Sequence, residues 1–429
     1  MKSLRIGIAG LGTVGCGTFE IVTKDAALLS NRCGSAVEIT AVSSRDKTRD
    51  RGIDLSGVTW HDDTLSLADD VNVDVVVELI GGHEGVAKEL CERSLANGKH
   101  VVTANKALIA MHGAELAALA EKNGVALYFE AAVAGGIPII KALREGLSAN
   151  RFQRVSGIMN GTCNYILTAM EKDARDFDDV LAEAQELGYA ETPPDLDVDG
   201  IDTAHKLTIL ASLAYGCLVD FEAVYSEGIR EVSLTDINYA RELGFAIRLL
   251  GITQQISENC IAQRVHPCLV PLESPFASIT GPQNAVLVEC NQVGPVLLTG
   301  AGAGAGATAS AVVADIMDIA NGHLAKPFTI AVDSLHRCKT EDISQHSGEY
   351  YIRVQVKDRP GVLAAITSIL SEQEIGVESV LQRAQKDGTA QIAVTTHAVT
   401  EQAIMVALSS LKDSDYVVEP PHMIRIENF

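Results

Sequence analysis

A glycine-rich turn near the beginning of the chain constrains the fold more than any other feature. The motif Gly10-Leu11-Gly12-Thr13-Val14-Gly15 follows the short apolar run at 4–9 (LRIGIA) and opens a stretch of helical character. In this setting GxGxxG predicts a dinucleotide-binding βαβ unit rather than a plain glycine-rich loop. Gly10 permits the tight turn, Gly12 lets the backbone approach a pyrophosphate, and Gly15 lets helix and strand pack closely, while the helix N-terminus favours the anion.

The first 132 residues alternate between strand-like and helix-like segments. The run at 73–80 (VDVVVELI) is almost wholly apolar, as expected of a strand buried on both faces of a parallel sheet. We predict further strands at 4–9, 37–42, 99–103 and 125–129, and helices from the glycine turn to about residue 29, at 84–97 and at 107–122. This order predicts a doubly wound, Rossmann-type sheet that forms the cofactor domain at 1–132 and is completed by a helix at 309–322.

The end of the second predicted strand bears on which nicotinamide cofactor binds. NAD sites need an acidic residue there for the ribose hydroxyls, but this chain has Ser43 and Ser44. Arg45 and Lys47 are available for a 2′-phosphate, whereas Asp46 could serve the ribose after a small shift of the loop. We therefore expect NADP(H) to be preferred, with use of NAD(H) as the alternative.

The remainder of the chain contains two further folded regions joined by a linker. Between 133 and 308 we predict a mixed α+β domain, with strands at 154–161, 285–291 and 295–300 and helices at 138–147, 177–187, 200–215 and 235–250. Residues 323–348 are largely polar and read as the linker. From 349 to 429 the predicted order is βαββαβ, the ferredoxin-like arrangement. The predicted fold class is therefore α/β, with a Rossmann-type sheet followed by an α+β domain and a ferredoxin-like domain.

Net charge and cysteine usage narrow the classes of function. The chain has 34 Lys and Arg against 56 Asp and Glu, a formal net charge of −22, which disfavours binding to a nucleic-acid backbone. No apolar run approaches the ~20 residues of a membrane helix. Nine cysteines without a CxxC pair indicate reduced, mostly buried thiols and no zinc framework. We expect a cytoplasmic protein with no nucleic-acid or membrane partner.

A cluster of acids at 188–206 (GYAETPPDLDVDGIDTAHK) is the most distinctive stretch outside the glycine turn. Asp202 and Lys206 stand four residues apart in a predicted helix, so their side chains share one face. A solvated ion pair at a helix start is the alternative to a functional pair. The acids lack the glycine-centred loop of an EF-hand, so calcium binding is disfavoured.

Several motifs, taken in order along the chain, resemble homoserine dehydrogenase. They are the glycine turn at 10–15, TANK at 103–106, NGT at 160–162, GYAE at 188–191, DGIDTAHK at 199–206, GAG at 302–304 and TASAVVAD at 308–315. Residues 349–429 resemble an ACT domain, the small amino-acid-sensing module. The resemblance implies reversible, NAD(P)H-dependent hydride reduction of L-aspartate 4-semialdehyde to L-homoserine in threonine, methionine and isoleucine biosynthesis. It also implies that the domain at 133–308 holds the substrate and serves dimerisation.

The same resemblance implies roles for individual residues. Lys206 would protonate the forming alkoxide and act as the base in the oxidation direction, with Lys106 as the second candidate. Glu191 and Asp202 would bind the amino and hydroxyl ends of the substrate, and Asp197 would line the same pocket. Lys106 would contact the substrate or the cofactor. Further cofactor contacts are implied for Gly10, Leu11, Gly12, Thr13, Val14, Gly15, Thr103, Gly188 and Gly302, with Arg45 at the 2′-phosphate.

The stretch EAAVAGGI at 130–137 resembles the sodium site of the family. The carboxylate of Glu130 and the backbone carbonyls of Val133, Gly135 and Ile137 would be its ligands. Hard oxygen ligands suit an alkali ion, whose role would be structural. Without the resemblance, the same residues read as a plain turn.

The ACT-like region begins with a strand-to-helix turn that carries the predicted regulatory site. Asp358, Pro360, Gly361 and Val362 belong to this turn, and free backbone amides at the helix start can hold a carboxylate. We expect L-threonine, a downstream product, as the effector, and pairing of ACT domains within a homodimer or homotetramer. A degenerate or purely oligomerising domain is the alternative.

Two departures from the family pattern and two rival functions stay open. Many members carry an acid at the position of Pro193, which leaves open how the loop at 191–197 is braced, and Cys163 stands where threonine is frequent.

An aldehyde-acylating dehydrogenase needs a nucleophilic cysteine near a histidine, and no cysteine here has such a setting. A non-catalytic sensor of NADP(H) and an amino acid would retain the glycine turn and the ACT domain but could lose the lysine and the acids.

Overall fold

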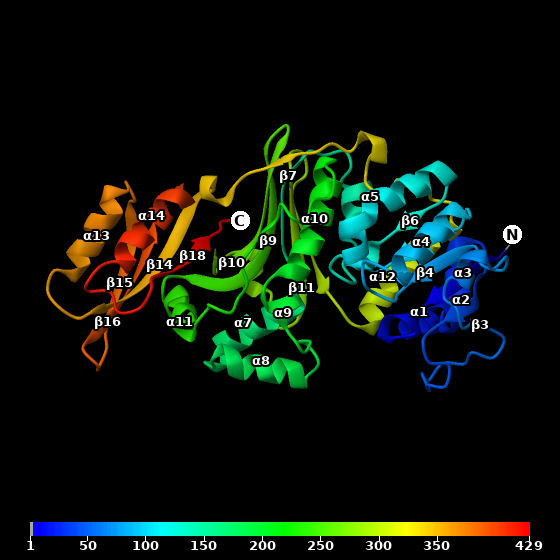
Figure 1. The fold of residues 1–429 in the computed structure, drawn as a ribbon, viewed down its shortest axis with the longest axis horizontal. Coiled ribbons are helices and arrows are strands. Elements are labelled where there is room, and N and C mark those ends of the chain that lie inside the picture. The colour runs from blue at the N-terminus through cyan, green and yellow to red at the C-terminus, as the bar shows by residue number, and fades with distance from the viewer. Residues whose placement is uncertain (1–2) are drawn as a thin grey trace.

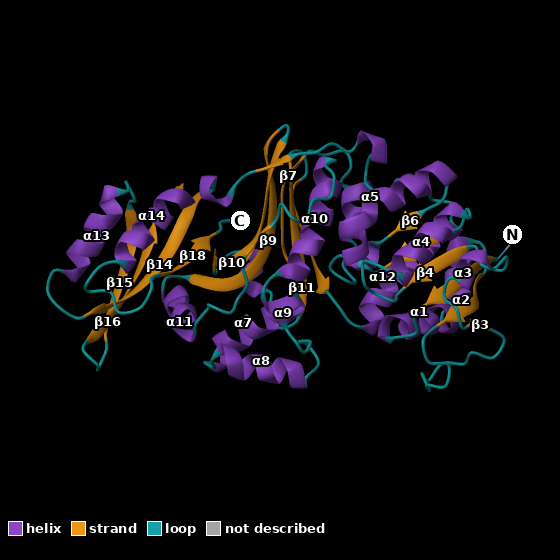
Figure 2. Ribbon diagram, in the orientation of Figure 1, coloured by secondary structure: helices purple, strands orange, loops and turns teal. Residues whose placement is uncertain are grey.

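The computed structural model describes residues 3–429 as three regions arranged along one axis (Figure 1). A small sheet with helices lies at one end, a larger sheet occupies the middle, and the C-terminal helices and strands lie at the other end. Figure 2 shows helices on both faces of the N-terminal sheet, as a doubly wound fold requires. The segment after α12 runs along the outside of the molecule from the N-terminal region toward the C-terminal one.

The N-terminal sheet has six parallel strands in the order β3-β2-β1-β4-β5-β6. Its elements are β1 (Leu4–Ala9), α1 (Thr13–Lys24), α2 (Ala26–Cys33), β2 (Val37–Ser43), β3 (Thr59–His61), α3 (Ser66–Asp69), β4 (Val75–Glu78), α4 (Val86–Ala96), β5 (His100–Thr103), α5 (Lys106–Asn123) and β6 (Leu127–Tyr128). The Rossmann-type sheet is confirmed. The helix expected to reach residue 29 instead ends at Lys24, and α2 follows after Asp25.

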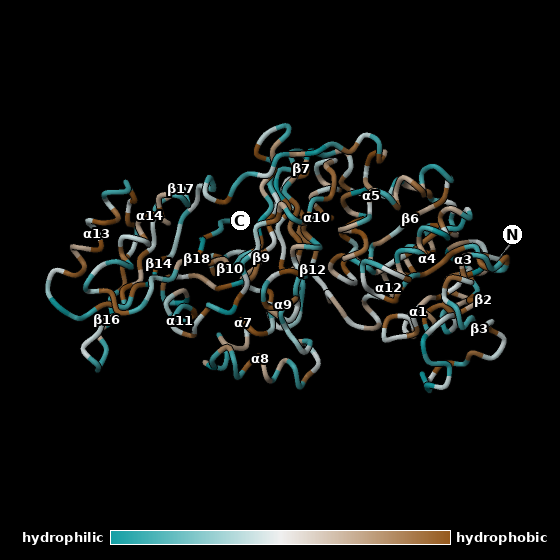
Figure 3. The backbone as a smooth tube through the Cα atoms, in the orientation of Figure 1, coloured by the Kyte–Doolittle hydropathy of each residue, from teal (hydrophilic) through white to brown (hydrophobic). Residues whose placement is uncertain are grey.

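Helix α12 (Ala305–Ala320) comes from far along the chain and packs against α1 (Figure 1). Gly17 permits this approach, because a Cβ atom there would lie 2.9 Å from the carbonyl oxygen of Ala305 and 3.2 Å from Cβ of Ala309. The core beneath the two helices is aliphatic and includes Ile8, Val75, Val77, Val312 and Ile316, all fully buried. Figure 3 shows the same hydrophobic character along β4, the strand predicted to be buried on both faces.

The second sheet runs through both the central and the C-terminal regions. Its main path follows the order β12-β11-β7-β9-β10-β18-β14-β16-β15. The last strand, β18 (His422–Ile426), joins the two regions, because it pairs parallel to β10 and antiparallel to β14. The C-terminal strands therefore extend the central sheet, and their βαββαβ order confirms the ferredoxin-like prediction.

The remaining elements follow in chain order. The central region contains η1 (Glu130–Ala132), α6 (Ile139–Lys141), the π-helical turn η2 (Ala142–Gly146), β7 (Phe152–Ile158), α7 (Gly161–Asp173), α8 (Phe177–Glu186), α9 (Asp195–Val198), α10 (Ile201–Tyr215), β8 (Tyr225–Ser226), α11 (Leu234–Glu242), β9 (Phe245–Ser257), β10 (Cys260–Pro271), η3 (Pro275–Ser278), β11 (Gln283–Cys290) and β12 (Gly294–Ala301). Beyond α12 lie η4 (Val332–Ser334), β13 (Lys339–Thr340), η5 (Ile343–Gln345), β14 (Ser347–Lys357), α13 (Val362–Glu372), β15 (Val377–Ala384), β16 (Thr389–Thr396), β17 (Val399–Thr400) and α14 (Glu401–Lys412).

Two helices expected in the central region differ from the structure. The helix expected at 235–250 ends at Glu242 as α11, and β9 follows from Phe245. The periodicity of the apolar run that begins β9 is compatible with either a helix or a strand. The segment forms a strand because it pairs with β10 along its whole length. The helix expected at 138–147 is divided between α6 and the π-helical turn η2. Helix α7 and strand β10 were not predicted.

Candidate active site

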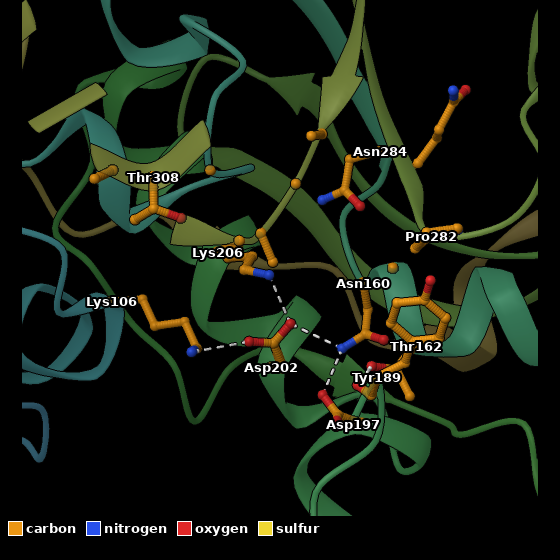
Figure 4. Close-up of a pocket in the computed structure, with 18 of the residues that line it drawn as sticks. Lys106, Asn160, Thr162, Tyr189, Asp197, Asp202, Lys206, Pro282, Asn284 and Thr308 are labelled. Atoms are coloured by element: carbon orange, nitrogen blue, oxygen red, sulfur yellow. Dashed lines mark hydrogen bonds and ion pairs between the residues drawn. The ribbon is translucent and has the colours of Figure 1, made fainter. Parts of the chain in front are cut away.

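A cavity of about 730 Å³ lies between the N-terminal sheet and the central region. Its polar lining includes Lys106, Asn160, Thr162, Glu191, Asp197, Asp202, Lys206, Gln283, Asn284 and Thr308. Figure 4 shows Lys106, Lys206 and Asn160 pointing toward Asp202 from separate elements. The acid cluster, the lysine after β5 and the GAG segment, which are far apart in the sequence, therefore face one space.

Asp202 is at the centre of this cluster. It lies in the first turn of α10, and its side chain is only 10% exposed. Its Oδ2 accepts a hydrogen bond from Nζ of Lys206 at 2.7 Å, and its Oδ1 lies 3.1 Å from Nζ of Lys106. Burial acts to raise the pKa of Asp202, but the charges of Lys206 and Lys106 outweigh it and hold that pKa well below its usual range. Asp202 therefore stays ionised between two ammonium groups.

The two lysines reach Asp202 from different parts of the fold. Lys206 lies one turn along α10, and its Nζ also donates to the carbonyl oxygen of Met159 at 2.7 Å. Lys106 is the first residue of α5, at the carboxyl edge of the parallel sheet, where ligands of such folds bind. The charge of Asp202 raises the pKa of Lys106 against the opposing effect of burial. The predicted pairing of Asp202 and Lys206 is confirmed, and burial distinguishes it from a solvated pair on an open helix face.

The loop around Pro193 is braced from a neighbouring segment. The guanidinium of Arg230 donates through Nε to Asp199 Oδ1 and through Nη2 to Asp195 Oδ1, each at 2.5 Å. These ion pairs hold both ends of α9 and so provide a brace without an acid at Pro193. Glu191 is exposed and lines the cavity where this loop borders it, and its role as a substrate ligand stays a prediction.

Asp197 completes the acidic side of the cavity together with Asn160. The Nδ2 atom of Asn160 donates to Asp197 Oδ1 and to Asp202 Oδ2, at 2.9 Å in each case. Burial raises the pKa of Asp197, and the hydrogen bond from Asn160 opposes that change. Cys163 is fully buried behind these groups, and its Sγ donates to the carbonyl oxygen of Asp197 at 3.2 Å. Burial raises the pKa of this thiol, as expected of a structural cysteine.

The glycine turn fits the roles predicted for it. A Cβ atom at Gly15 would lie 2.0 Å from the carbonyl oxygen of Gly10, and one at Gly10 would lie 2.5 Å from the carbonyl oxygen of Leu79. Gly12, by contrast, has open space around its Cα atom, with no other group within 4 Å of a Cβ placed there. Gly10 and Gly15 therefore shape the turn, whereas Gly12 leaves room for a ligand to approach the backbone. Val14 brings the following helix to the cavity wall.

The opposite wall of the cavity is formed by small residues around an unpaired amide. A Cβ atom at Gly302 would lie 2.1 Å from the side chain of Asn284, and one at Gly135 would lie 2.3 Å from the carbonyl oxygen of Gly302. Both amide atoms of Asn284 are buried and have no hydrogen-bond partner among residues 3–429. Gly188 lines the cavity as well. A buried unpaired amide beside glycines fits a wall that a polar ligand completes.

The loop after β2 carries a second arginine, Arg51, that the sequence analysis missed. The hydroxyl of Ser43 is paired with that of Thr64 at 2.9 Å, whereas Arg45 is exposed on the loop that follows. Arg51 turns back toward the glycine turn, where its Nε donates to the carbonyl oxygen of Leu11 at 3.2 Å. No motif identifies Arg51, because its contact with the glycine turn depends on the path of the loop. The run RDKTRDR at 45–51 predicts only that this loop is rich in cationic side chains.

Thr103 and its partner Glu78 lie behind the cavity at the same sheet edge. Both are fully buried, and the Thr103 hydroxyl donates to Glu78 Oε2 at 2.6 Å. Glu78 also accepts from the backbone N–H of Ile80 at 2.7 Å, and so holds the turn after β4. The acid near the end of the apolar run VDVVVELI, directly after three valines, could have indicated this role. The cofactor contact expected of Thr103 stays a prediction.

The predicted sodium loop is buried against α12. Glu130 is 2% exposed, and its two carboxylate oxygens accept backbone N–H groups of Ile140 and Lys141 at 2.9 and 2.8 Å. Burial, followed by the charge of Asp315, raises the pKa of Glu130 to about 8. The carbonyl oxygen of Ile137 already accepts the N–H of Ile139 at 2.8 Å. A monovalent cation would fit this loop, because it would supply positive charge beside a buried carboxylate.

The predicted regulatory turn lies far from the cavity, at the other end of the molecule (Figure 1). Asp358, Pro360 and Gly361 are exposed, and Val362 begins α13 as a buried residue. Gly361 adopts φ +91°, a left-handed conformation that favours glycine at the helix N-terminus. The turn is thus exposed at the N-terminus of α13, where the first N–H groups of a helix have no intrahelical partner, and its ligand stays a prediction.

Membrane-length apolar helices, clusters of metal-ligating side chains and disulfides are absent from residues 3–429. Every helix there is too short or too polar to cross a membrane. No group of three His, Cys, Asp or Glu side chains in that range is placed to hold a metal ion. All nine cysteines are free and six of them are buried, as predicted, and none lines the cavity.

Comparisons with known protein families and curated relatives agree with this site. Residues 138–317 match the family described as homoserine dehydrogenase, residues 10–130 match its NAD-binding domain, and residues 350–413 match the ACT domain. Homoserine dehydrogenase of Pseudomonas aeruginosa is 45% identical over 435 residues, covering 100% of this chain and 99% of that protein. The enzyme of Bacillus subtilis is 38% identical with the same coverage.

Solved structures show the same relationship over the whole fold. A homoserine dehydrogenase from Thiobacillus denitrificans superposes with a TM-score of 0.93 at 43% identity, covering 100% of this chain and 99% of that one. The S. aureus enzyme at pH 7.5 gives 0.77 at 29% identity with the same coverage. A hyperthermophilic archaeal homoserine dehydrogenase in complex with NADPH gives 0.64 at 28% identity, over 76% of this chain and all of that one. This chain therefore belongs to the homoserine dehydrogenase family.

Proposed function

We propose that the chain reduces L-aspartate 4-semialdehyde reversibly to L-homoserine, with Lys206 as the general acid and NADP(H) as the preferred cofactor. The observation that carries the proposal is the shared position of Asp202 between Lys206 and Lys106 inside the cavity. A carbonyl that accepts hydride develops negative charge on its oxygen, and a fixed ammonium group stabilises and protonates that oxygen. Asp202 keeps both ammonium groups in place, and its single negative charge does not cancel the two positive charges of the lysines.

The cofactor would bind along the wall that carries the glycine turn, Gly302 and Thr308. When bound, the reduced nicotinamide supplies the hydride. The residues of this chain do the rest: Gly12 leaves room for the pyrophosphate, and Lys206 donates a proton to the oxygen formed on the substrate. In the oxidation direction the neutral amine of Lys206 accepts the hydroxyl proton of homoserine. Lys106 is the second candidate for this proton and otherwise holds Asp202 in position.

The acidic side of the cavity suits the amino end of the substrate. Glu191 and Asp197 offer carboxylates toward an ammonium group, and Asp202 faces the hydroxyl end. The N-terminus of α7 also borders the cavity at Gly161 and Thr162, where free backbone N–H groups favour a carboxylate. An α-amino acid with a short polar side chain matches these three requirements.

Preference for NADP(H) is supported by the cationic loop after β2. Arg51 is held against the glycine turn, and Arg45 and Lys47 lie on the same loop. A 2′-phosphate would find positive charge there, whereas the Ser43 hydroxyl is already paired with Thr64. NAD(H) use stays the alternative through Asp46.

Structural sodium and regulation by L-threonine belong to the same proposal. Glu130 with the carbonyls of Val133, Gly135 and Ile137 would hold the ion, and the raised pKa of Glu130 supports a site that gains from a cation. Threonine would bind at the turn of Asp358–Val362 and act through a homodimer or homotetramer with paired ACT domains. Light scattering with and without threonine would measure that oligomeric state.

The decisive experiment follows absorbance of the reduced nicotinamide with purified protein, L-homoserine and NADP⁺ or NAD⁺, with and without L-threonine. We expect homoserine-dependent reduction, faster with NADP⁺ at equal concentration and slower with threonine present. Absence of reduction with either cofactor, in protein that binds NADPH by calorimetry, would instead support the non-catalytic sensor. Threonine without effect on rate or oligomeric state would reject the proposed regulation alone.

A further inference from the structure

We infer that Asn160 is a positioning residue for this reaction: its amide holds the carboxylates of Asp197 and Asp202 side by side and aims Asp202 at Lys206. The inference rests on the roles proposed above for Asp202 and Lys206. Asn160 lies outside both the acid cluster and the glycine turn, at the junction of β7 and α7, and neither feature gives it a role. It is 4% exposed and lines the cavity.

The backbone determines which way the Asn160 amide points. Its Oδ1 accepts the N–H of Cys163 at 2.8 Å and so caps the N-terminus of α7. This leaves both N–H bonds of Nδ2 for the cavity, where they reach Asp197 Oδ1 and Asp202 Oδ2 at 2.9 Å each. The reverse orientation would turn the amide oxygen toward two carboxylates and leave the helix N-terminus without its cap.

Neighbouring residues make the junction a fixed point. The carbonyl oxygen of Met159, next to Asn160, accepts from Nζ of Lys206 at 2.7 Å. Two consecutive residues therefore hold both members of the Lys206–Asp202 pair. Gly161 follows in a tight position, since a Cβ there would lie 2.7 Å from the carbonyl oxygen of Pro282.

A neutral double donor suits this place better than a cation. The buried carboxylate of Asp202 and the half-buried one of Asp197 repel one another, and hydrogen bonds to their ionised forms offset that repulsion. A lysine or arginine at the same position would compete with Lys206 for Asp202 and add charge to the substrate site. An amide stabilises both acids and leaves the ammonium of Lys206 as the proton donor.

Two substitutions separate positioning from helix capping. Asn160→Ser keeps a good N-cap but removes both amide donors, and Asn160→Asp keeps the cap and the side-chain volume but adds a third acid. We expect kcat to fall about 10- to 100-fold in each, the range for losing hydrogen bonds to charged groups. We also expect the acid limb of the kcat/KM profile to move up by about one pH unit, further in Asn160→Asp, since the remaining carboxylates lose a donor.

Asn105→Ser is the matched control. Asn105 caps α5 through Oδ1, but its Nδ2 donates to the carbonyl oxygen of Gly82 rather than to carboxylates. Its substitution should leave the acid limb in place. NADPH binding and thermal unfolding establish that each variant is folded, and if Asn160→Ser is not, the isosteric Asn160→Asp decides.

The outcomes distinguish this inference from the proposed function. Wild-type protein without homoserine-dependent turnover would refute the proposed function itself. Wild-type turnover, together with a folded Asn160→Ser or Asn160→Asp variant that keeps kcat within twofold and the same acid limb, would refute only the positioning role. Asn160 would then be a helix cap.

Discussion

The Nζ atom of Lys106 lies 3.1 Å from the Oδ1 atom of Asp202, and this contact joins the first turn of α5 to the first turn of α10. Helix α5 is part of the N-terminal region and α10 is part of the central region. The ion pair therefore connects the two regions at the cavity. Because Lys206 occupies the other carboxylate oxygen, the two lysines are not equivalent. Lys206 is held from within α10, whereas Lys106 depends on the relative position of two regions.

This asymmetry predicts different effects of removing each lysine. Lys206→Ala should lower kcat by about 10²- to 10⁴-fold, since the transition state loses its proton donor. Lys106→Ala should mainly raise KM for homoserine, about tenfold, because Asp202 keeps Lys206 as a partner. Steady-state kinetics of homoserine oxidation measure both, with NADPH titration as the control for folding. A larger loss of kcat in Lys106→Ala than in Lys206→Ala would instead make Lys106 the proton donor and Lys206 the residue that holds Asp202.

Arg51 should contribute to selection of the 2′-phosphate. Replacing Arg51 by alanine removes a cation held 3.2 Å from the glycine turn, and a charged hydrogen bond lost to a phosphate raises KM for NADP⁺ by about 10- to 100-fold. KM for NAD⁺ should change much less. Arg45→Ala tests the other candidate on the loop, and Arg32→Ala, on the exposed side of α2, is the matched control. Equal losses for both cofactors would mean that Arg51 only supports the turn.

Arg230 should act on substrate affinity through the loop it braces. Arg230→Ala removes exposed ion pairs to Asp195 and Asp199, each expected to contribute only about 0.2–1 kcal/mol. KM for homoserine should therefore rise about two- to fivefold while NADPH binding is unchanged. Arg241→Ala, which removes an exposed arginine from its ion pair with Glu171 on α7, is the control. An unchanged KM in Arg230→Ala would show that the loop holds its position by other contacts.

Features set by short-range spacing could be predicted from the sequence. The glycine turn, the apolar strand at 73–80 and the pairing of Asp202 with Lys206 depend on residues within a few positions of one another, and the structure confirms all three. Strand β9 could not be separated from a helix in this way, since its assignment depends on β10 as a partner.

The contacts that assemble the site are long-range. Asn160 and Lys106 line the cavity, and Arg51 reaches the glycine turn, only because distant elements pack together. The family motifs TANK and NGT contain Lys106 and Asn160, but no local pattern shows that both side chains meet Asp202. The same holds for β18, whose last residues pair with β10 and join the C-terminal strands to the central sheet. That junction also contains a half-buried histidine, His346, that neither composition nor motif would single out.

His346 should make the stability of this junction depend on pH. Its ring is 12% exposed, with Nε2 4.0 Å from Glu427 Oε1, and it faces the buried Arg264 and Arg425. Burial, followed by the charge of Arg264, lowers the pKa of His346 to about 4 from an ordinary 6.5. Between these values the unfolded chain binds a proton that the folded protein does not, so stability falls as pH falls.

The expected loss is about 2–3 kcal/mol between neutral pH and pH 4, given the size of the shift and some exposure to solvent. His346→Gln removes the titrating group, and its apparent Tm should decline less than that of the wild type as pH is lowered from 7.5 to 5. His323→Gln is the matched control, because His323 is 70% exposed. The difference between the variants, rather than either curve alone, carries the test, since carboxylates titrate in both. Parallel Tm curves for wild type and His346→Gln would contradict the prediction and place the acid sensitivity of the fold elsewhere.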